Sequence, residues 1–392
     1  MLSVTRLLTG TVGTQDALRY RQASRDTPAH MLHFAREKKP VVVWNVTQRC
    51  NLHCAHCYSD SKNRDYPDEL STEEGLGLLA DLAGFGVPTV LFSGGEPLLR
   101  DDLFVLARAA RELGMRTVLS SNGTLLDEAT AEEAADAGFS YAGLSIDGVP
   151  ERHDKLRGKP GAFRRTIGGI RAARRAGLRT GVRFTVNAIN RADLAPIFEL
   201  AERERVDRLC VYHLAYAGRG ERMARLDLQP ETTREVVEEI FDRVEDQRRR
   251  GVSMEVLTVD NPVDNVLLLK RIQATQPARA AEVEQLLRWN GGNQSGIAIA
   301  CVDPRGRVHP DQFSWHIDAG DIRQRGFAEI WNDANPVLAP YRQRPRAVGG
   351  RCAECRFFAL CNGGLRVRAE SASADRLAPD PACYLTDEEI AA

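Results

Sequence analysis

Three cysteines lie close together in the first part of the chain, in the segment Cys-Asn-Leu-His-Cys-Ala-His-Cys. Cys50, Cys54 and Cys57 follow a C-x3-C-x2-C spacing. Three thiolates on one loop can hold three irons of a [4Fe-4S] cluster, whereas clusters that only carry electrons usually have four cysteine ligands. The fourth iron is then open to a substrate or cofactor, which indicates chemistry at the iron. A zinc site completed by His53 or His56 is the alternative for the same residues.

Four more cysteines are grouped near the other end of the chain. They are Cys352, Cys355, Cys361 and Cys383. Four thiolates complete a [4Fe-4S] cluster with no open iron, and such a cluster transfers electrons or stabilises the fold. A structural zinc site is the alternative. We expect the two remaining cysteines, Cys210 and Cys301, to be buried thiols without a metal.

Composition and charge exclude several classes of protein. The chain has 392 residues, of which 43% are hydrophobic, enough to bury a large core without disulfides. The 53 basic residues are balanced by 54 acidic ones, so we expect no nucleic acid partner. No apolar run approaches the ~18 residues of a membrane span, and we expect no membrane association. The N-terminus lacks a signal peptide pattern, and closely spaced cysteines favour a reducing compartment, so the expected location is cytoplasmic.

Strands and helices alternate between the two cysteine groups, which indicates how the chemistry is positioned. Strands are expected at 40–50, 88–97, 117–123, 139–148, 178–187 and 206–218, and helices at 72–85, 101–113, 127–138, 162–177, 193–204 and 230–250. Six such repeats imply an α/β fold with parallel strands and helices outside. The loops at the carboxyl ends of the strands then converge on one mouth.

We divide the chain into four segments. They are a polar leader (1–38), the β/α part (39–245), a connecting region (246–299) and a small cysteine-rich domain (300–392). A hairpin over 295–311, turning at 304–306, is expected where the last two segments meet.

The order of these motifs resembles the radical S-adenosylmethionine (SAM) superfamily. The three-cysteine loop follows the first strand, and Gly94-Gly95-Glu96-Pro97 follows the second. The resemblance covers about residues 40–240 and implies a partial (β/α)6 barrel whose open iron binds the amino and carboxylate groups of SAM. One electron then cleaves SAM to methionine and a 5′-deoxyadenosyl radical, which abstracts a hydrogen atom.

The same resemblance implies which residues contact SAM. The glycine pair lets the backbone approach the methionine part closely, Glu96 accepts from its ammonium group, and Arg183 pairs with its carboxylate. His56 replaces an often aromatic residue that packs on the adenine. The full set expected at the cofactor is His56, Gly94, Gly95, Glu96, Ser121, Asn122, Ser145, Asp147 and Arg183.

The second cysteine group resembles the SPASM and twitch extensions of radical SAM enzymes. The full SPASM pattern has a further cysteine where Leu365 stands, and cysteines flanking the preceding hairpin, where Cys301 and His309 stand. The chain therefore has too few cysteine ligands for an additional cluster. The resemblance implies one auxiliary [4Fe-4S] cluster, and hence two clusters in all.

Segments along the whole chain resemble the tetrapyrrole-modifying radical SAM enzymes of the alternative haem pathway. They are 255–261, 291–296, 307–316, 361–370 and 380–389, together with the leader. The resemblance implies removal of the two acetate side chains, on rings A and B, of 12,18-didecarboxysiroheme to give iron-coproporphyrin III. In our hypothesis, a radical on the neighbouring ring carbon breaks the bond to each acetate, and the fragment takes up an electron and a proton.

Other activities remain open at this point. Haem d1 biosynthesis and coproheme decarboxylation act on related tetrapyrroles, and peptide-modifying SPASM enzymes share the motifs. A non-catalytic electron carrier is a further alternative. If the protein is a catalyst, the expected partners are the iron tetrapyrrole and an electron donor such as ferredoxin or flavodoxin.

If the substrate is a flat iron tetrapyrrole with many carboxylates, we expect particular side chains to contact it. Arg219 and Arg222 follow the sixth strand, and arginine pairs well with carboxylates. The substrate iron invites a histidine axial ligand, for which the candidates are His213, His309 and His316. Phe313 and Trp315 are candidates for packing on the macrocycle.

Overall fold

A computed structural model describes residues 1–13, 16, 19, 39–332 and 334–391. The described strands form one eleven-stranded sheet, in the order β1-β8-β7-β6-β5-β4-β3-β2-β9-β10-β11. Eight neighbouring strands of this sheet are parallel. They are β9, described below, and β2 (Val41–Asn45), β3 (Thr89–Ser93), β4 (Arg116–Ser121), β5 (Phe139–Ser145), β6 (Arg179–Val186), β7 (Arg208–His213) and β8 (Glu255–Val259). The expected α/β fold is confirmed.

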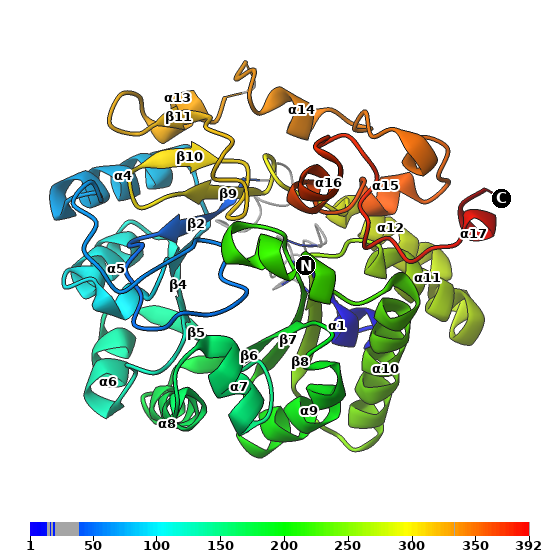
Figure 1. Ribbon diagram of the computed structural model, residues 1–392, viewed down its shortest axis with the longest axis horizontal. Helices are drawn as coiled ribbons and strands as arrows, with labels where there is room; N and C mark the ends of the chain where they lie inside the picture. The colour runs from blue at the N-terminus through cyan, green and yellow to red at the C-terminus, as the bar shows by residue number, and fades with distance from the viewer. Residues whose placement is uncertain (14–15, 17–18, 20–38, 333, 392) are drawn as a thin grey trace.

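Helices surround the curved sheet (Figure 1). Those between β2 and β9 are α4 (Thr72–Phe85), α5 (Leu103–Glu112), α6 (Glu128–Asp136), α7 (Pro150–Arg157), α8 (Ala162–Arg175), α9 (Leu194–Arg203), α10 (Pro230–Arg249), α11 (Asp264–Thr275) and α12 (Ala280–Asn290). In α4, Ser71 and Glu74 form a capping box, and Leu78, Leu79 and Leu82 are buried, so both local and packing signals favour the helix. Six of these helices match the expected ranges, and α7, α11 and α12 were not predicted.

Strand β8 is a further parallel strand that the sequence does not predict. All five of its side chains are buried, so it lacks the alternation that reveals a half-buried strand. Because β8 pairs with β7, the sheet extends into the segment expected to be a connection. The expected boundary at residue 245 falls inside α10. The division into domains stays a prediction.

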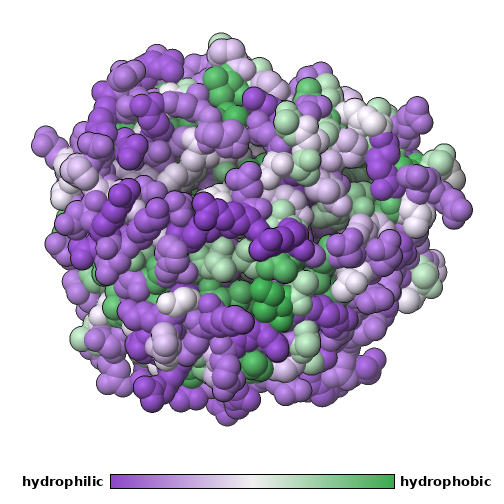
Figure 2. Space-filling view, viewed as in Figure 1, coloured by the Kyte–Doolittle hydropathy of each residue, from purple (hydrophilic) through white to green (hydrophobic). Residues whose placement is uncertain are grey.

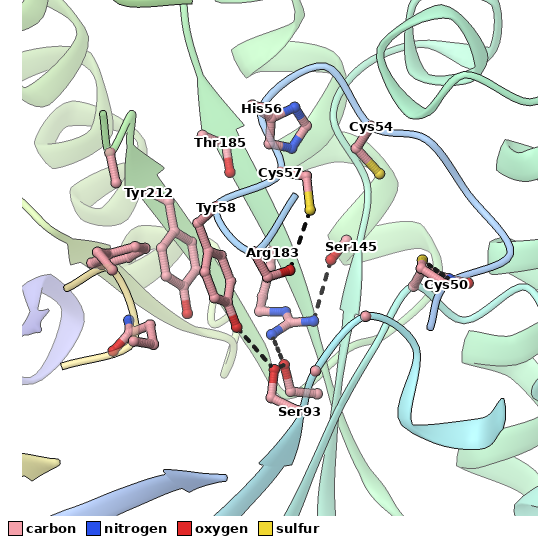
Figure 3. A pocket seen from close by; sticks show the side chains of 18 of the residues that line it. Cys50, Cys54, His56, Cys57, Tyr58, Ser93, Ser145, Arg183, Thr185 and Tyr212 are labelled. Carbon is pink, nitrogen blue, oxygen red and sulfur yellow. Dashed lines mark hydrogen bonds between the residues drawn. The ribbon is translucent and has the colours of Figure 1, made fainter. Parts of the chain in front are cut away.

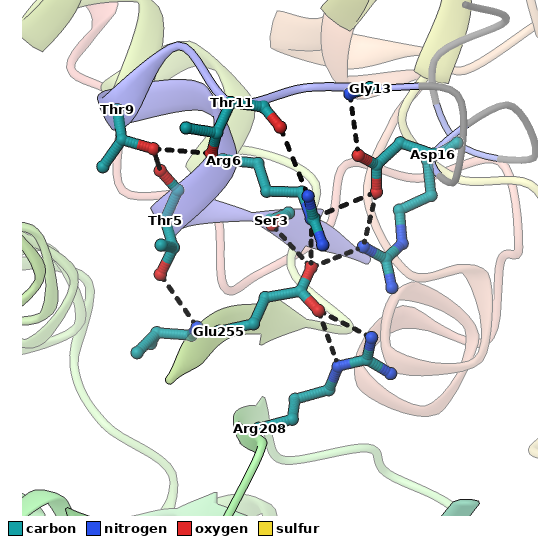
Figure 4. A network of polar contacts seen from close by, with 11 residues as sticks. Ser3, Thr5, Arg6, Thr9, Thr11, Gly13, Asp16, Arg208 and Glu255 are labelled. Atoms are coloured by element: carbon teal, nitrogen blue, oxygen red, sulfur yellow. Dashed lines mark hydrogen bonds and ion pairs between the residues drawn. The ribbon is translucent and has the colours of Figure 1, made fainter. Parts of the chain in front are cut away.

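The described part of the leader adds a short strand and a helix to this edge of the sheet. β1 (Leu2–Ser3) pairs antiparallel with β8, and α1 (Val4–Thr9) follows it. Figure 4 shows the contacts around Glu255, where Ser3 Oγ donates at 2.8 Å and Arg208 Nη2 lies at 2.6 Å. Burial opposes ionisation of Glu255, but Arg19 and Arg208 hold its pKa well below the usual range. Most of the leader lies outside the described residues.

The C-terminal part continues the sheet on the opposite side. β9 (Ile299–Val302) pairs parallel with β2, and β10 (Arg307–His309) forms the expected hairpin with it. β11 (Gly320–Asp321) ends the sheet. The remaining helices are short: α13 (Phe327–Ile330), α14 (Ala339–Arg342), α15 (Phe358–Cys361), α16 (Arg366–Ser373) and α17 (Asp387–Ala391). In Figure 1 this part, orange to red, runs along one side of the barrel.

The surface around the barrel is mostly hydrophilic. In Figure 2 the hydrophobic residues of the viewed face gather near its centre, within a hydrophilic rim. None of the helices in the described ranges has the length and apolar character needed to cross a membrane.

Candidate active site at the barrel mouth

The first cysteine group lies in the loop after β2, at the mouth of the barrel. Cys50 and Cys54 are buried and Cys57 is partly buried. Burial raises the pKa of the Cys50 thiol to about 12 and also raises the pKa of Cys54. At neutral pH these side chains become thiolates only beside a strong positive charge, such as that of a metal centre. The donor set therefore fits an iron–sulfur cluster.

Arg219 anchors this cysteine loop. It lies in the 3-10 helix η4 (Gly218–Leu226), which follows β7. Its Nε donates to Cys54 O at 2.7 Å, and its Nη1 donates to Ser61 O and Asp60 Oδ1, both at 2.9 Å. Its backbone N donates to Cys57 O at 2.9 Å. The guanidinium thus binds the cysteine loop, and Arg219 also lines the cavity; its expected contact with a substrate carboxylate stays a prediction.

Asp147, two residues beyond β5, forms a buried ion pair behind the cysteine loop. Its Oδ2 lies 2.5 Å from Arg157 Nη2 and 3.2 Å from His56 Nε2. Burial opposes the ionised form, but Arg157 and His56 hold the pKa of Asp147 well below its usual range. Asp147 orients these two side chains and is not among the residues that line the cavity. Its expected contact with SAM stays a prediction.

The glycine pair after β3 packs against the backbone that leads to the cysteines. A Cβ on Gly94 would lie 2.3 Å from Thr47 O, and one on Gly95 would lie 2.2 Å from Arg49 O. Gly94 also has a φ of +144°, so only glycine fits there without strain. The close approach predicted toward SAM is therefore made to the segment after β2, although both glycines also line the cavity.

Glu96 joins two neighbouring strand-end loops. Its carboxylate accepts from Ser121 Oγ at 2.7 Å, from Asn122 N at 2.8 Å and from Leu98 N at 3.2 Å. The side chain is fully buried and does not line the cavity. Glu96 is thus enclosed by these donors, and its expected contact with the SAM ammonium group stays a prediction.

One cavity lies between the cysteine loop and the strand ends (Figure 3). The sequence-predicted residues that line it are Cys50, Cys54, His56, Cys57, Gly94, Gly95, Ser121, Asn122, Ser145, Arg183, His213 and Arg219. Arg183, on β6, donates from Nη2 to Ser121 O at 3.1 Å and to Ser145 Oγ at 3.2 Å. Its Nε is buried without a partner in the described part of the chain. The structure therefore brings most of the predicted cofactor residues together.

Several lining residues were missed by the sequence analysis, among them Tyr58, Tyr212, Asp260 and Gln312. The Tyr58 hydroxyl donates to Asn45 Oδ1 at 2.7 Å, and Figure 3 shows Tyr58 and Tyr212 close together in the cavity. Tyr212 could have been found, because its strand was predicted. Asp260, whose pKa burial raises to about 6, follows the unpredicted strand β8.

The cavity is closed on one side by the C-terminal part of the chain. Gln312 and Phe313 line it from the loop between β10 and β11. The ring of Phe313 packs edge-on against Tyr58, with centroids 5.4 Å apart. Phe313 thus lines the cavity, whereas Trp315 is not among the lining residues. Packing of either ring on a macrocycle stays a prediction.

Among the three candidate axial ligands, His213 is the one that touches the cavity. Its Nε2 lies 3.0 Å from Asp264 Oδ2, and Asp264 Oδ1 accepts from Tyr384 OH at 2.8 Å. His213 follows Tyr212 in β7, so its side chain leaves the opposite face of the sheet. Its ring is therefore turned toward α11.

The other three predicted substrate contacts lie away from the cavity. His309 is fully buried, with Nδ1 2.8 Å from Ile317 O. His316 is half exposed and lies 2.9 Å from a Glu370 carboxylate oxygen. Arg222 is exposed on η4. None of these placements favours a substrate contact, and the three expected contacts, which rested on residue type alone, stay predictions.

The second cysteine group is assembled from three short segments. Cys352 ends the 3-10 helix η6 (Gly350–Cys352), Cys361 ends α15, and Cys383 precedes α17. Burial and the neighbouring Cys383 raise the pKa of Cys352 to about 11, and Cys355 adds to the same charge cluster. In the described ranges, no three His, Cys, Asp or Glu side chains are close enough to hold a single metal ion.

Comparison with known proteins places the chain in a family. Residues 44–201 match the Radical SAM superfamily. The chain is 48% identical to the Fe-coproporphyrin III synthase of Methanosarcina barkeri, over 100% of this chain and 99% of that protein. It is 41% identical to the pre-heme d1 synthase of Dinoroseobacter shibae, over 90% and 87% of the two chains.

The fold is also found among solved structures. Streptococcus suis SuiB bound to S-adenosylmethionine superposes with a TM-score of 0.71 over 93% of this chain and 84% of that chain, at 18% identity. The three-cysteine loop, the glycine pair beside it and the full-length similarity agree: the chain belongs to the radical SAM superfamily.

Proposed function

We propose that this protein is an Fe-coproporphyrin III synthase that removes the two acetate side chains of 12,18-didecarboxysiroheme in a SAM-dependent reaction. The observation that carries the proposal is the 48% identity to the Methanosarcina barkeri enzyme of that name, which spans the whole chain. It therefore includes both cysteine groups and every segment that lines the cavity. A tetrapyrrole substrate also suits a cavity whose wall includes Tyr58, Tyr212 and Phe313.

The proposed cofactors are SAM and two [4Fe-4S] clusters. Cys50, Cys54 and Cys57 would hold the first cluster, which with SAM supplies the radical that starts the reaction. The gathering of these three cysteines on one loop that lines the cavity supports a bound cluster there. Arg183 and Asn122 line the same end of the cavity and would orient the charged groups of SAM through their N–H donors.

The opposite end of the cavity would hold the tetrapyrrole. Tyr212 and Asp260 lie at the ends of the last two parallel strands, and Gln312 reaches in from the C-terminal part. Amide and hydroxyl donors would hydrogen-bond the substrate carboxylates. Since burial raises the pKa of Asp260 to about 6, its carboxyl group carries a proton for part of the time near neutral pH and is suited to deliver it to the departing fragment.

The second cysteine group would hold one auxiliary cluster that passes electrons. Its ligands would be Cys352, Cys355, Cys361 and Cys383, with a ferredoxin or flavodoxin as the external donor. Such a protein would work in the reducing cytoplasm, where closely spaced thiols stay reduced. Iron and zinc analysis of the anaerobically purified chain tests this: two clusters require about eight irons per chain and no zinc.

The substrate is tested by anaerobic turnover with a panel. Reduced protein and SAM would be incubated separately with 12,18-didecarboxysiroheme and with coproheme, and the products analysed by mass spectrometry. We expect turnover of the first and none of the second. Conversion of coproheme would instead indicate a haem synthase. Loss of side chains other than acetate from the first substrate would indicate an activity nearer to haem d1 biosynthesis.

A further inference from the structure

Two buried arginines, Arg346 and Arg366, lie around the second cysteine group without a carboxylate in direct contact. Arg344, which is exposed, lies beside Arg346. In the described part of the chain, no carboxylate oxygen lies within 4.0 Å of these three guanidinium groups, while Arg368 nearby has such a partner. A buried positive charge is costly unless an anion offsets it. Asp380 acts on Arg366 only from a greater distance, so an anion in direct contact would stabilise this cluster of charges.

Arg344 and Arg346 direct their donors to neutral oxygens. Arg344 Nη1 donates to Tyr341 O at 2.7 Å, and Arg346 donates to Asn293 Oδ1 at 2.6 Å and to Ser295 O at 3.0 Å. Burial lowers the pKa of Arg346 to about 9, while the more distant Asp311 acts in the opposite direction. Neither guanidinium has a carboxylate in direct contact among the described residues.

Arg366 also has unused donors. Its side chain is 2% exposed, and its Nη1 donates to Arg376 O at 2.7 Å and to Ala378 O at 2.8 Å. Its Nε and Nη2 are buried and make no hydrogen bond in the described residues. Cys352 and Cys361 are near enough to interact with its charge. Two donors are therefore left open next to the cysteine group.

Arg368, two residues along the same helix, shows the contrast. It is fully buried, and its Nε and Nη2 donate to the two carboxylate oxygens of Asp380, at 2.7 and 2.9 Å. Its Nη1 donates to Leu214 O at 2.8 Å. The fold can provide hydrogen-bond acceptors for a buried arginine in this region. The unpaired Nε and Nη2 of Arg366 therefore indicate that a ligand accepts their hydrogen bonds.

We propose that Arg366 donates hydrogen bonds from Nε and Nη2 to the auxiliary cluster held by the second cysteine group, and that it raises the reduction potential of that cluster with the help of Arg344 and Arg346. The inference rests on the proposed function, because it requires a cluster at these cysteines. Such a cluster is negative and gains negative charge on reduction, so nearby positive charge and N–H donors favour the reduced form.

The test measures the potential of the auxiliary cluster alone. The full chain with Cys50, Cys54 and Cys57 changed to Ala keeps only that cluster, and an EPR-monitored redox titration gives its midpoint potential. Arg366→Met in this background is expected to shift the potential to more negative values. Arg376→Met is the control, because it removes a neighbouring, partly exposed guanidinium that pairs with Glu370; it should leave the potential unchanged.

Each other outcome overturns a specific part of the account. An unchanged potential in Arg366→Met, or a shift to more positive values, contradicts its role. If Arg366→Met loses its iron, Arg366→Gln, which keeps a donor but no charge, should give the negative shift, and its absence contradicts the proposal. Absence of iron from the parent triple variant would instead refute the auxiliary cluster itself.

Discussion

Arg157 and Asp147 form a buried ion pair that braces the cysteine loop, with Arg157 Nη2 2.5 Å from Asp147 Oδ2. The Nη1 of the same guanidinium lies 3.6 Å from Cys54 Sγ. The backbone of Arg157 accepts from His53 N at 3.2 Å. One residue of α7 therefore links the end of β5 to the loop that carries the first cysteine group.

Replacing this arginine should destabilise the fold and the cluster together. In Arg157→Met, Asp147 would stay buried with only His56 to offset its charge, which costs about 3–5 kcal/mol of unfolding free energy. Denaturant unfolding and iron content per chain measure the two effects. The control is Arg171→Met, which breaks an ion pair between Glu204 and a largely exposed arginine and should cost less than about 1 kcal/mol. Equal losses in the two variants would contradict the bracing role.

His153 should make the stability depend on pH. Burial and the nearby Arg157 lower its pKa from 6.5 to about 4, so the unfolded chain binds the proton more readily than the folded one. The free energy of unfolding is then lost as pH falls from about 6.5 to about 4, by about 3 kcal/mol.

The variant that checks this is His153→Asn, whose side-chain oxygen can accept from Asp147 N as His153 Nδ1 does at 3.0 Å. Its stability should change less over the same pH interval. The half-exposed His316 provides the matched control, and His316→Asn should keep the wild-type pH profile. A wild-type slope in His153→Asn would assign the pH dependence to other groups.

Gly95 should not tolerate a side chain. The Cβ of Gly95→Ala would lie 2.2 Å from Arg49 O, so the loop must shift, at a cost of about 3 kcal/mol. Gly84→Ala, in helix α4 with no atom within 4 Å of its Cβ, should stabilise the protein by about 0.5–1 kcal/mol. Thermal unfolding compares the two, and a neutral Gly95→Ala would show that the close backbone approach is not needed.

Arg219→Met should reduce the retention of the first cluster and leave substrate binding unchanged. Because the Arg219 guanidinium donates to Cys54 O, its removal should lower iron content and SAM cleavage, while the KM for the tetrapyrrole stays near the wild-type value. Arg222→Met, on the same helix but exposed, should leave both unchanged. A raised KM with full iron content would support the substrate role that the sequence suggested for Arg219.

The sequence predicts the repeating elements and the residues at strand ends, because each strand and helix has its own local pattern. It also predicts Arg183 at the cavity, since the strand that carries it is recognisable. It does not predict β8, whose side chains are all buried, and so Asp260 is missed. Local patterns also cannot tell that Arg219 faces the cysteine loop or that Glu96 is enclosed by Ser121 and Asn122. Those contacts join segments far apart in the chain.

The most direct measurement is the stoichiometry of anaerobic turnover. Reconstituted protein, SAM and a low-potential reductant would be supplied with 12,18-didecarboxysiroheme, and iron-coproporphyrin III, acetate and 5′-deoxyadenosine would be quantified in the same samples. The account predicts two acetate groups lost and two deoxyadenosines formed per product, and no product when Cys50, Cys54 and Cys57 are replaced by Ala. Deoxyadenosine formed with the substrate unchanged would keep the superfamily chemistry but contradict the proposed substrate.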